Sequence, residues 1–185
     1  EPILGQVIEL EGDGLVTHAW SKALQGQRAV ITGAARGIGL ATAERFVSEG
    51  ADLLMVDLGG DDGSLEREAD RLGAKALALD ITSETAGAQM LEALGGSVDL
   101  AIHNAGITRD RTLAKMSADN WNQAVAVNLG AVERMLETLP VQDGGRIVVL
   151  SSVAGLAGNF GQTNYAAAKS GLAAMVRYHA PSLRP

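Results

Sequence analysis

The feature that most constrains this chain is a glycine-rich turn between a short apolar run and a helical stretch. The apolar run, residues 29–32, predicts a buried strand, and apolar side chains recur at helical spacing over residues 38–49. Gly33 permits a tight turn, Gly37 lets the backbone approach a ligand, and Gly39 lets the helix pack closely on the strand. The first amides of that helix, with the positive end of its dipole, then suit a phosphate. The turn therefore predicts dinucleotide binding, against the alternative of a flexible turn with incidental glycines.

The same alternation continues along the rest of the chain. Apolar runs of strand length are separated by stretches of helical periodicity, one of which has Ser117 as its expected N-cap. Continuous apolar strands joined by helices predict a parallel sheet covered on both faces, and right-handed crossovers make it doubly wound. We therefore expect an α/β, Rossmann-like fold with ligands at the carboxyl ends of the strands. The further strands are expected at 53–56, 76–79, 98–102 and 146–150, and the further helices around 65–72, 90–94, 117–139 and 164–178.

The two ends of the chain depart from this alternation. Residues 5–10 alternate like a lone strand, which is unstable unless it pairs with another segment. A Gly-rich and polar linker is expected over residues 13–26, followed by the dinucleotide-binding domain over residues 27–185. Because no apolar run follows residues 146–150, we expect the parallel sheet to be incomplete at its C-terminal end.

The composition excludes several kinds of function. The 185 residues carry a formal net charge of −7 at pH 7, whereas a nucleic-acid partner requires a basic face. Cysteine is absent, which excludes disulfides and thiolate metal sites. The sequence shows neither an apolar run of membrane length nor a basic-then-apolar leader. We therefore expect a globular, cytoplasmic protein without nucleic-acid, membrane or metal partners.

Asp57 follows the second strand of the alternation and favours NAD over NADP. A carboxylate at this place accepts hydrogen bonds from both adenosine ribose hydroxyls and repels a 2′-phosphate. Arg36, in the glycine turn, opposes this preference because its charge offsets that of a 2′-phosphate. No Lys or Arg directly follows Asp57. We therefore expect NAD(H) as the preferred cofactor and NADP(H) as the second possibility, with an ordinary loop aspartate as the alternative.

Three residues in the last third of the chain suit proton transfer to a carbonyl. Tyr165 and Lys169 are four residues apart, on one face of a predicted helix. An ammonium so placed stabilises a phenolate, as a general acid and base requires, and it can also hold a nicotinamide ribose. Ser152 follows the fifth strand, where its hydroxyl can stabilise charge on the reacting oxygen. The Tyr–Lys pair alone is weak support, since this spacing occurs by chance in many surface helices.

Taken together, these motifs resemble those of the short-chain dehydrogenase/reductases over roughly residues 24–184. The matching residues are, in chain order, Thr32-Gly33, Gly37-Ile38-Gly39, Asn104-Ala105-Gly106, Asn128, Ser151-Ser152, Tyr165 and Lys169. The resemblance implies Tyr165 as proton donor, Lys169 as its partner and ribose ligand, and Ser152 as the residue that orients the carbonyl. It further implies that a helix kink at Asn128 holds a water in a proton relay to Lys169.

The resemblance also implies which residues surround the cofactor. These are Gly33, Arg36, Gly37, Ile38, Gly39, Asp57, Asp80, Ile81, Asn104, Ala105, Gly106, Tyr165 and Lys169. Asp80 and Asn104 can instead be purely structural, and Asn128 can simply cap or bend its helix. His103 stands where the family commonly has Asn, and we interpret it as a packed or hydrogen-bonded residue rather than a catalytic one.

Within the family, residues 104–110 and 158–165 are most similar to those of 3-oxoacyl-[acyl-carrier-protein] reductases. High-molecular-weight members of that group carry an upstream, cofactor-free Rossmann-like domain, so residues 1–12 are expected to include its terminal strand. The implied reaction is the reduction of a 3-oxoacyl thioester, carried by acyl carrier protein or CoA, in fatty-acid biosynthesis. The family's Pro-Gly stretch after the sixth strand, its substrate-lid helices and its terminal strand do not occur in this sequence.

Other functions stay open on the sequence alone. The same fold serves dehydrogenases of hydroxyacyl-CoA, sugars, steroids and small alcohols, and it can serve as a non-catalytic nucleotide-binding scaffold. Arg109 can meet phosphopantetheine or acids of a carrier protein, or it can be a solvated loop charge. By analogy with the family, the helices around 120–136 and 164–178 predict a homodimer or homotetramer.

Overall fold

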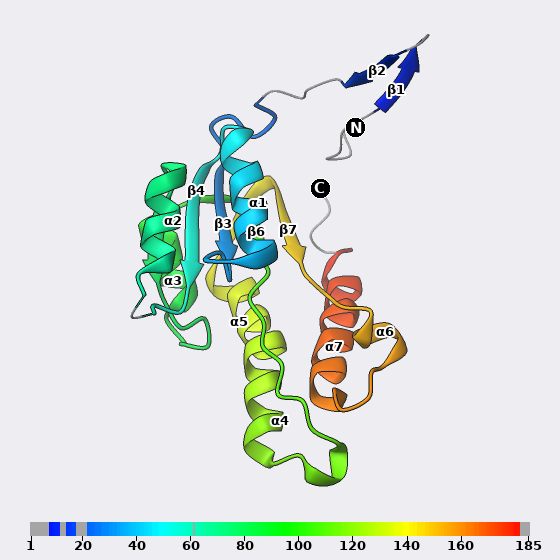
Figure 1. Cartoon of the computed structure of the whole chain (residues 1–185). Helices are drawn as coiled ribbons and strands as arrows, with labels where there is room; N and C mark the ends of the chain where they lie inside the picture. Colours follow the sequence, from blue (N-terminus) through cyan, green and yellow to red (C-terminus); the bar gives the residue numbers. More distant parts are fainter. Residues whose placement is uncertain (1–7, 12–13, 18–21, 61, 182–185) are drawn as a thin grey trace.

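The computed structural model describes residues 8–11, 14–17, 22–60 and 62–181. Its centre is a parallel sheet in which the strand order reverses between β3 and β6 (Figure 1). This reversal is the topological switch point at which doubly wound sheets bind their ligands. The predicted doubly wound, Rossmann-like α/β fold is therefore confirmed. Across the sheet the strands are β5 (Lys75–Ala78), β4 (Asp52–Asp57), β3 (Arg28–Thr32), β6 (Val98–His103) and β7 (Val141–Val149).

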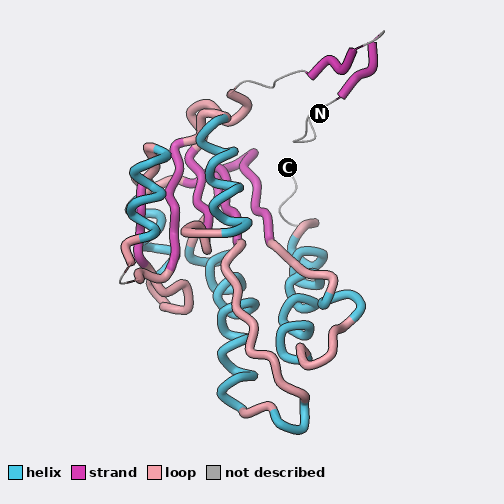
Figure 2. Tube along the Cα trace, viewed as in Figure 1, coloured by secondary structure: helices cyan, strands magenta, loops and turns pink. Residues whose placement is uncertain are grey.

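Helices cover both faces of this sheet, as Figure 2 shows. Side chains alternate along each strand, so Ile31 and Met55 join one apolar cluster while Val30 and Leu54 join the other. Because both faces are buried, the strands are apolar at nearly every position rather than at every second one. Helices α1 (Gly37–Ser48) and α2 (Ser64–Leu72) pack on the first cluster, and α3 (Ala86–Ala93), α5 (Ala131–Thr138) and α7 (Thr163–His179) on the second.

The long helix predicted over residues 117–139 is interrupted in the structure. Ser117 caps its start as predicted, since its Oγ accepts a hydrogen bond from the Asn120 amide. Between α4 (Ala118–Val125) and α5, the segment η2 (Ala126–Gly130) winds as a π-helix. Such π turns are rare and occur frequently at functional sites.

The start of β7 also differs from the sequence prediction. Strand β7 begins at Val141 rather than Arg146, and its pairing with β6 shifts register after Val98. Gly144 adopts a φ of +82° in the shifted segment, where a glycine accommodates a bulge inside the strand. Two short helices complete the described part of the chain: η1 (Leu113–Lys115) and α6 (Ala154–Ala157).

The N-terminal segment forms a separate two-stranded sheet. Strands β1 (Ile8–Glu11) and β2 (Gly14–Thr17) pair antiparallel. The expected lone strand at residues 5–10 thus overlaps β1 and finds its partner in β2, which falls within the predicted linker; residues 5–7 lie outside the described residues. The division into an upstream remnant, a linker and a catalytic domain stays a prediction. Among the described residues, no helix has both the length and the apolar character that a membrane crossing requires.

Candidate active site

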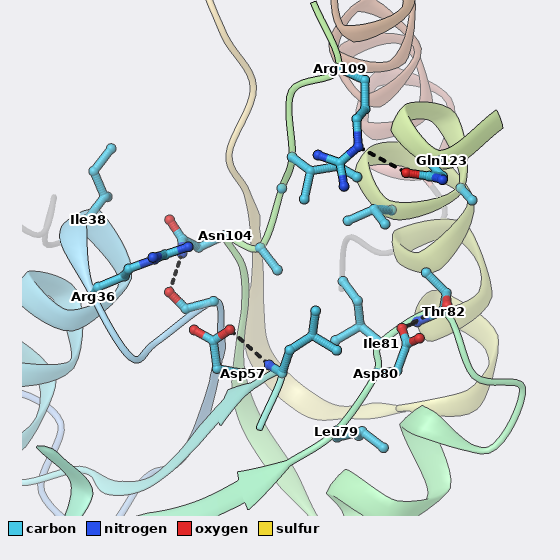
Figure 3. Close-up of a pocket in the computed structure, with 17 residues that line it drawn as sticks. Arg36, Ile38, Asp57, Leu79, Asp80, Ile81, Thr82, Asn104, Arg109 and Gln123 are labelled. Atoms are coloured by element: carbon cyan, nitrogen blue, oxygen red, sulfur yellow. Dashed lines mark hydrogen bonds between the residues drawn. The ribbon is translucent and has the colours of Figure 1, made fainter. Parts of the chain in front are cut away.

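An open cavity of about 580 Å³ lies at the switch point, beside the carboxyl ends of β3, β4 and β6 (Figure 3). It is the place where the fold itself predicts a ligand. Nine of the predicted cofactor residues line it: Gly33, Arg36, Ile38, Asp57, Asp80, Ile81, Asn104, Ala105 and Gly106. The other predicted residues, Gly37, Gly39, Ser152, Tyr165, Lys169 and Asn128, are not part of its lining.

The glycine turn has the geometry that its spacing predicts. Gly33 and Gly37 both adopt positive φ, +69° and +60°, which favours glycine over residues with a Cβ. A Cβ on Gly39 would lie 2.0 Å from the Gly33 carbonyl oxygen, so helix α1 packs on the turn more closely than any side chain allows. The N-cap residue Arg36 makes no side-chain cap hydrogen bond, which leaves the first amides of α1 available to an anion.

Asp57 lies at the end of β4 with its carboxylate held by backbone amides. Its Oδ2 accepts a hydrogen bond from the Ala35 amide at 2.9 Å, and its Oδ1 accepts one from Leu58 at 2.8 Å. Each carboxylate oxygen can accept a further hydrogen bond, because it carries two lone pairs. Arg36 lines the same cavity and forms no ion pair with Asp57. The carboxylate is thus fixed in orientation and not neutralised by the nearby cation.

Asn104 and Asp80 have structural contacts in addition to lining the cavity. The Asn104 amide donates to the carbonyl oxygens of Thr32 and Gly33, at 2.9 and 3.0 Å, and so joins the ends of β3 and β6. Asp80 Oδ1 accepts hydrogen bonds from the amide and hydroxyl of Thr82, at 2.8 and 2.7 Å, in a tight turn after β5. Both residues therefore have the structural role that the sequence left open, at the edge of the site.

Lys169, Tyr165 and Asn128 come together at the amino-terminal part of α7. The Lys169 ammonium is buried and lies 5.7 Å from the centre of the Tyr165 ring, where it donates to the Leu150 carbonyl oxygen at 2.7 Å. Burial lowers the pKa of Lys169. A Cβ on Gly106 would lie 2.6 Å from Asn128 Oδ1 and 3.5 Å from Lys169 Nζ, so both polar groups lie close to Gly106.

Asn128 sits within the π-helix η2 and is fully buried. Its side-chain amide donates to the carbonyl oxygens of Ile107 and Ala124, at 2.7 and 2.8 Å, and its Oδ1 accepts from the Ile107 amide at 3.3 Å. The helix irregularity that the resemblance implied is therefore present. It places the loop after β6 directly against the amide of Asn128.

Ser152 lies in the segment between β7 and α6. Its hydroxyl oxygen accepts a hydrogen bond from the Ala154 amide at 3.2 Å, which leaves the hydroxyl proton free to donate. The neighbouring Ser151 donates to the Lys169 carbonyl oxygen at 2.9 Å. Ser151 therefore has a structural role, because it ties the segment after β7 to α7.

His103 is packed, as the sequence suggested, rather than part of the candidate site. It ends β6, is only 4% exposed, and its Nδ1 has no hydrogen-bond partner among the described residues. Burial lowers the pKa of His103 to about 4. The histidine is thus neutral at pH 7 and is buried inside the protein.

Several residues of the cavity wall were not predicted from the sequence. Arg109, which the sequence left undecided, lies at the cavity, and its Nε donates to Gln123 Oε1 at 2.9 Å (Figure 3). Gln123 and Val127 reach the cavity from two consecutive turns of the α4–η2 segment. The position of this segment beside the cavity depends on the path of the loop before it, which the sequence pattern does not show. Leu58 could have been found, since it directly follows Asp57 at a strand end. Within the described ranges, no three His, Asp or Glu side chains converge to hold a metal ion.

Comparisons with known proteins agree with this geometry. The profile of the family described as short chain dehydrogenase matches residues 27–185. The 3-oxoacyl-[acyl-carrier-protein] reductase FabG of Salmonella typhimurium is 40% identical over 157 residues, which cover 80% of this chain and 64% of that protein. FabG of Thermotoga maritima is 38% identical over 170 residues, or 86% of this chain and 69% of that protein. The peroxisomal multifunctional enzyme type 2 of Drosophila melanogaster is 41% identical over 164 residues, 27% of its own length.

The chain belongs to the short-chain dehydrogenase family. The resemblance inferred from its motifs, including the similarity to 3-oxoacyl-[acyl-carrier-protein] reductases, is confirmed. The matched part of the chain spans 64% of the length of FabG from Salmonella typhimurium.

Proposed function

We propose that this protein reduces a 3-oxoacyl thioester, carried by acyl carrier protein or CoA, to the 3-hydroxyacyl thioester in fatty-acid biosynthesis, with NADH as the preferred reductant. The observation that carries this proposal is the meeting of Tyr165, Lys169 and Asn128 behind a dinucleotide-type cavity. Relatives named as 3-oxoacyl-[acyl-carrier-protein] reductases support the choice of substrate.

The cavity residues fit a nicotinamide dinucleotide. The open face at Gly37, where a Cβ would meet nothing within 4 Å, leaves room for a pyrophosphate at the start of α1. The oriented carboxylate of Asp57 suits two ribose hydroxyls and repels a 2′-phosphate, so NADH is preferred and NADPH is the second possibility. When bound, the cofactor supplies a hydride to carbon 3 of the thioester.

The chain's own residues handle the proton and the developing charge. As carbon 3 gains the hydride, the carbonyl oxygen becomes an alkoxide and takes the phenolic proton of Tyr165. The Lys169 ammonium stabilises the phenolate that remains. The Ser152 hydroxyl donates a hydrogen bond to the oxygen of the substrate carbonyl. Asn128, through its place beside Gly106 and Lys169, holds the water that returns a proton toward Lys169. Each such group typically contributes about 10²–10⁴-fold in rate.

Arg109 supports an anionic substrate carrier. Its guanidinium is oriented toward the cavity by Gln123 and by the Thr108 carbonyl oxygen, at 2.9 Å each, and it keeps further N–H groups free. Phosphopantetheine carries the charge that such a group recognises. A second candidate function, the dehydrogenation of a hydroxyacyl-CoA or another alcohol, uses the same residues.

By analogy with the family, we also propose a cytoplasmic homodimer or homotetramer that pairs through α4, α5 and α7. Light scattering of the protein at its natural length tests this assembly. A mass that stays monomeric over a wide concentration range contradicts it.

The proposed reaction is tested by the loss of NADH absorbance with acetoacetyl-CoA, using the protein at its natural length. The matched variant is Tyr165→Phe, which removes only the phenolic proton. We expect turnover to fall by about 10³-fold while NADH binding, measured by fluorescence, stays unchanged. Equal turnover in the two proteins excludes Tyr165 as the acid. Binding without turnover in the native protein excludes this substrate and favours the dehydrogenation of other alcohols.

A further inference from the structure

A buried asparagine directly precedes Tyr165 and connects three segments of the chain. Asn164 is fully buried, and its side-chain amide donates to the Arg109 carbonyl oxygen at 3.1 Å and to the Asn120 carbonyl oxygen at 3.0 Å. The first oxygen belongs to the loop after β6, and the second lies in the first turn of α4. One side chain therefore joins the start of α7 to the loop after β6 and to α4, two of the segments that border the cavity.

Asn164 also satisfies the backbone at the start of α7. Its Oδ1 accepts a hydrogen bond from the Tyr165 amide at 2.8 Å. That amide is among the first four of the helix, which have no partner within the helix itself. The side chain of Gln162, at the N-cap position, accepts no capping hydrogen bond from these amides. Three of the four hydrogen-bonding positions of the Asn164 amide group are thus in use, one of them on the backbone of Tyr165 itself.

Two further contacts hold the same loop to the segment before α7. The Gln162 side chain donates to Asp110 Oδ2 at 2.9 Å, and the Arg111 amide donates to the Gly161 carbonyl oxygen at 2.9 Å. Gly161 has a φ of +77°, in the region that favours glycine. The Gln162 contact is exposed and the Arg111 contact joins backbone groups, whereas the Asn164 side chain is itself fully buried, where unpaired polar groups are costly.

We propose that Asn164 is the positioning residue of Tyr165: it fixes the first turn of α7, and with it the phenol, against the Arg109 loop and α4. This inference rests on the proposed function, because it concerns the direction in which Tyr165 gives its proton. Since the same amide holds the Arg109 loop, the segment that meets the substrate and the residue that protonates it share one fixed frame. A proton donor held in this way stays within hydrogen-bond reach of the carbonyl oxygen.

The test compares Asn164→Ala with the native protein at its natural length, and Asn122→Ala serves as the matched control. Asn122 is an exposed asparagine on α4 whose side chain makes none of these contacts. For Asn164→Ala we expect kcat with acetoacetyl-CoA to fall at least tenfold, while the dissociation constant for NADH changes less than twofold. The solvent deuterium isotope effect on kcat/KM should rise, because proton transfer from a displaced phenol becomes slower. A mere loss of folded protein lowers kcat without changing that isotope effect.

Amide hydrogen exchange supplies a readout that does not depend on turnover. Faster exchange in residues 108–111 and 163–168 of Asn164→Ala, but not of Asn122→Ala, supports the positioning role. If Asn164→Ala does not fold, Asn164→Ser, which keeps a hydroxyl donor, takes its place. Native exchange together with a native isotope effect overturns the proposal. Faster exchange in a protein whose native form shows no Tyr165-dependent turnover leaves the contacts in place and overturns the proposed function instead.

Discussion

The two ends of the candidate site are held together by different kinds of contact. At the cofactor end, the turn from Gly33 to Gly39 depends on the absence of side chains, since a Cβ on Gly39 would lie 2.0 Å from the Gly33 carbonyl oxygen. One long-range side-chain hydrogen bond, from Asn104 to that same oxygen, supports the turn. At the proposed catalytic end, Asn128, Asn164 and Lys169 each donate a side-chain hydrogen bond to a carbonyl oxygen of a distant segment. The first end is therefore sensitive to a Cβ added at Gly33 or Gly39, and the second to the loss of single polar groups.

The difference means that the two ends of the candidate site respond to different kinds of substitution. At the turn, the closest fit is made by glycines that have no Cβ, and the Asn104 side chain adds a hydrogen bond to the Gly33 carbonyl oxygen. Side-chain contacts to carbonyl oxygens, in contrast, hold α4, η2 and α7 in place and depend on how those segments pack. The residues proposed to act on the substrate are thus held by contacts that depend on how these segments pack.

The largest expected effect comes from adding a methyl group at the cofactor end. In Gly39→Ala the new Cβ meets the Gly33 carbonyl oxygen, and neither backbone can move without displacing the strand or the helix. We expect NADH binding to weaken by more than about 100-fold and the unfolding free energy to fall by about 1–3 kcal/mol. Fluorescence titration and urea unfolding measure the two effects.

The matched control is Gly37→Ala, where the new Cβ has open space and only the positive φ of +60° is strained. We expect its unfolding free energy to fall by about 1–2 kcal/mol. Native NADH binding in Gly39→Ala would contradict the view that close backbone approach builds this end of the site.

The second-largest expected effect concerns the protonation of His103 at the end of β6. His103 has a pKa of about 4 in the folded protein, against 6.5 for the unfolded chain. The folded state therefore binds fewer protons than the unfolded state between these values, and stability is lost as the pH falls through this window. We expect the unfolding free energy to fall by about 2 kcal/mol between pH 7 and pH 5 on account of His103.

Urea unfolding over this pH range measures the effect in the native protein and in His103→Asn, which has no group that titrates there. The two proteins should differ in the slope of stability against pH, and not only in its level. Parallel curves of stability against pH would show that the pKa of His103 is the same in the folded and the unfolded protein. That result would contradict the lowering of its pKa by burial.

The smallest expected effect concerns the carboxylate of Asp57. In Asp57→Asn the repulsion of a 2′-phosphate is removed, while the shape of the side chain and its acceptor for the Ala35 amide are kept. We expect the preference for NADH over NADPH in kcat/KM to fall by about tenfold, or about 1.4 kcal/mol. Arg36→Ala is the opposing control and should raise the same preference. An unchanged ratio in both variants would assign cofactor choice to other residues of the cavity.

The structure could be predicted from the sequence where a local pattern determines it. The strands at residues 29–32 and 53–56, the cap at Ser117 and the glycine turn each follow from a period, a cap residue or a spacing within one short segment. The prediction was less accurate at β7, which begins at Val141, five residues before the predicted start, and contains a bulge opposite β6. A bulge is decided by the partner strand, and the partner is not visible in the local pattern.

The sequence by itself determined the doubly wound fold, the phosphate-type turn and the acidic residue beside it, because hydrophobic period and glycine spacing act over a few neighbouring residues. Only the tertiary structure decided that Asn164 meets Arg109, 55 residues away, and that Asn128 meets Ile107, 21 residues away. Their acceptors are backbone carbonyl oxygens, which every residue possesses, so no residue type marks them in the sequence. Burial then makes these contacts specific, since a carbonyl group removed from water must find a donor.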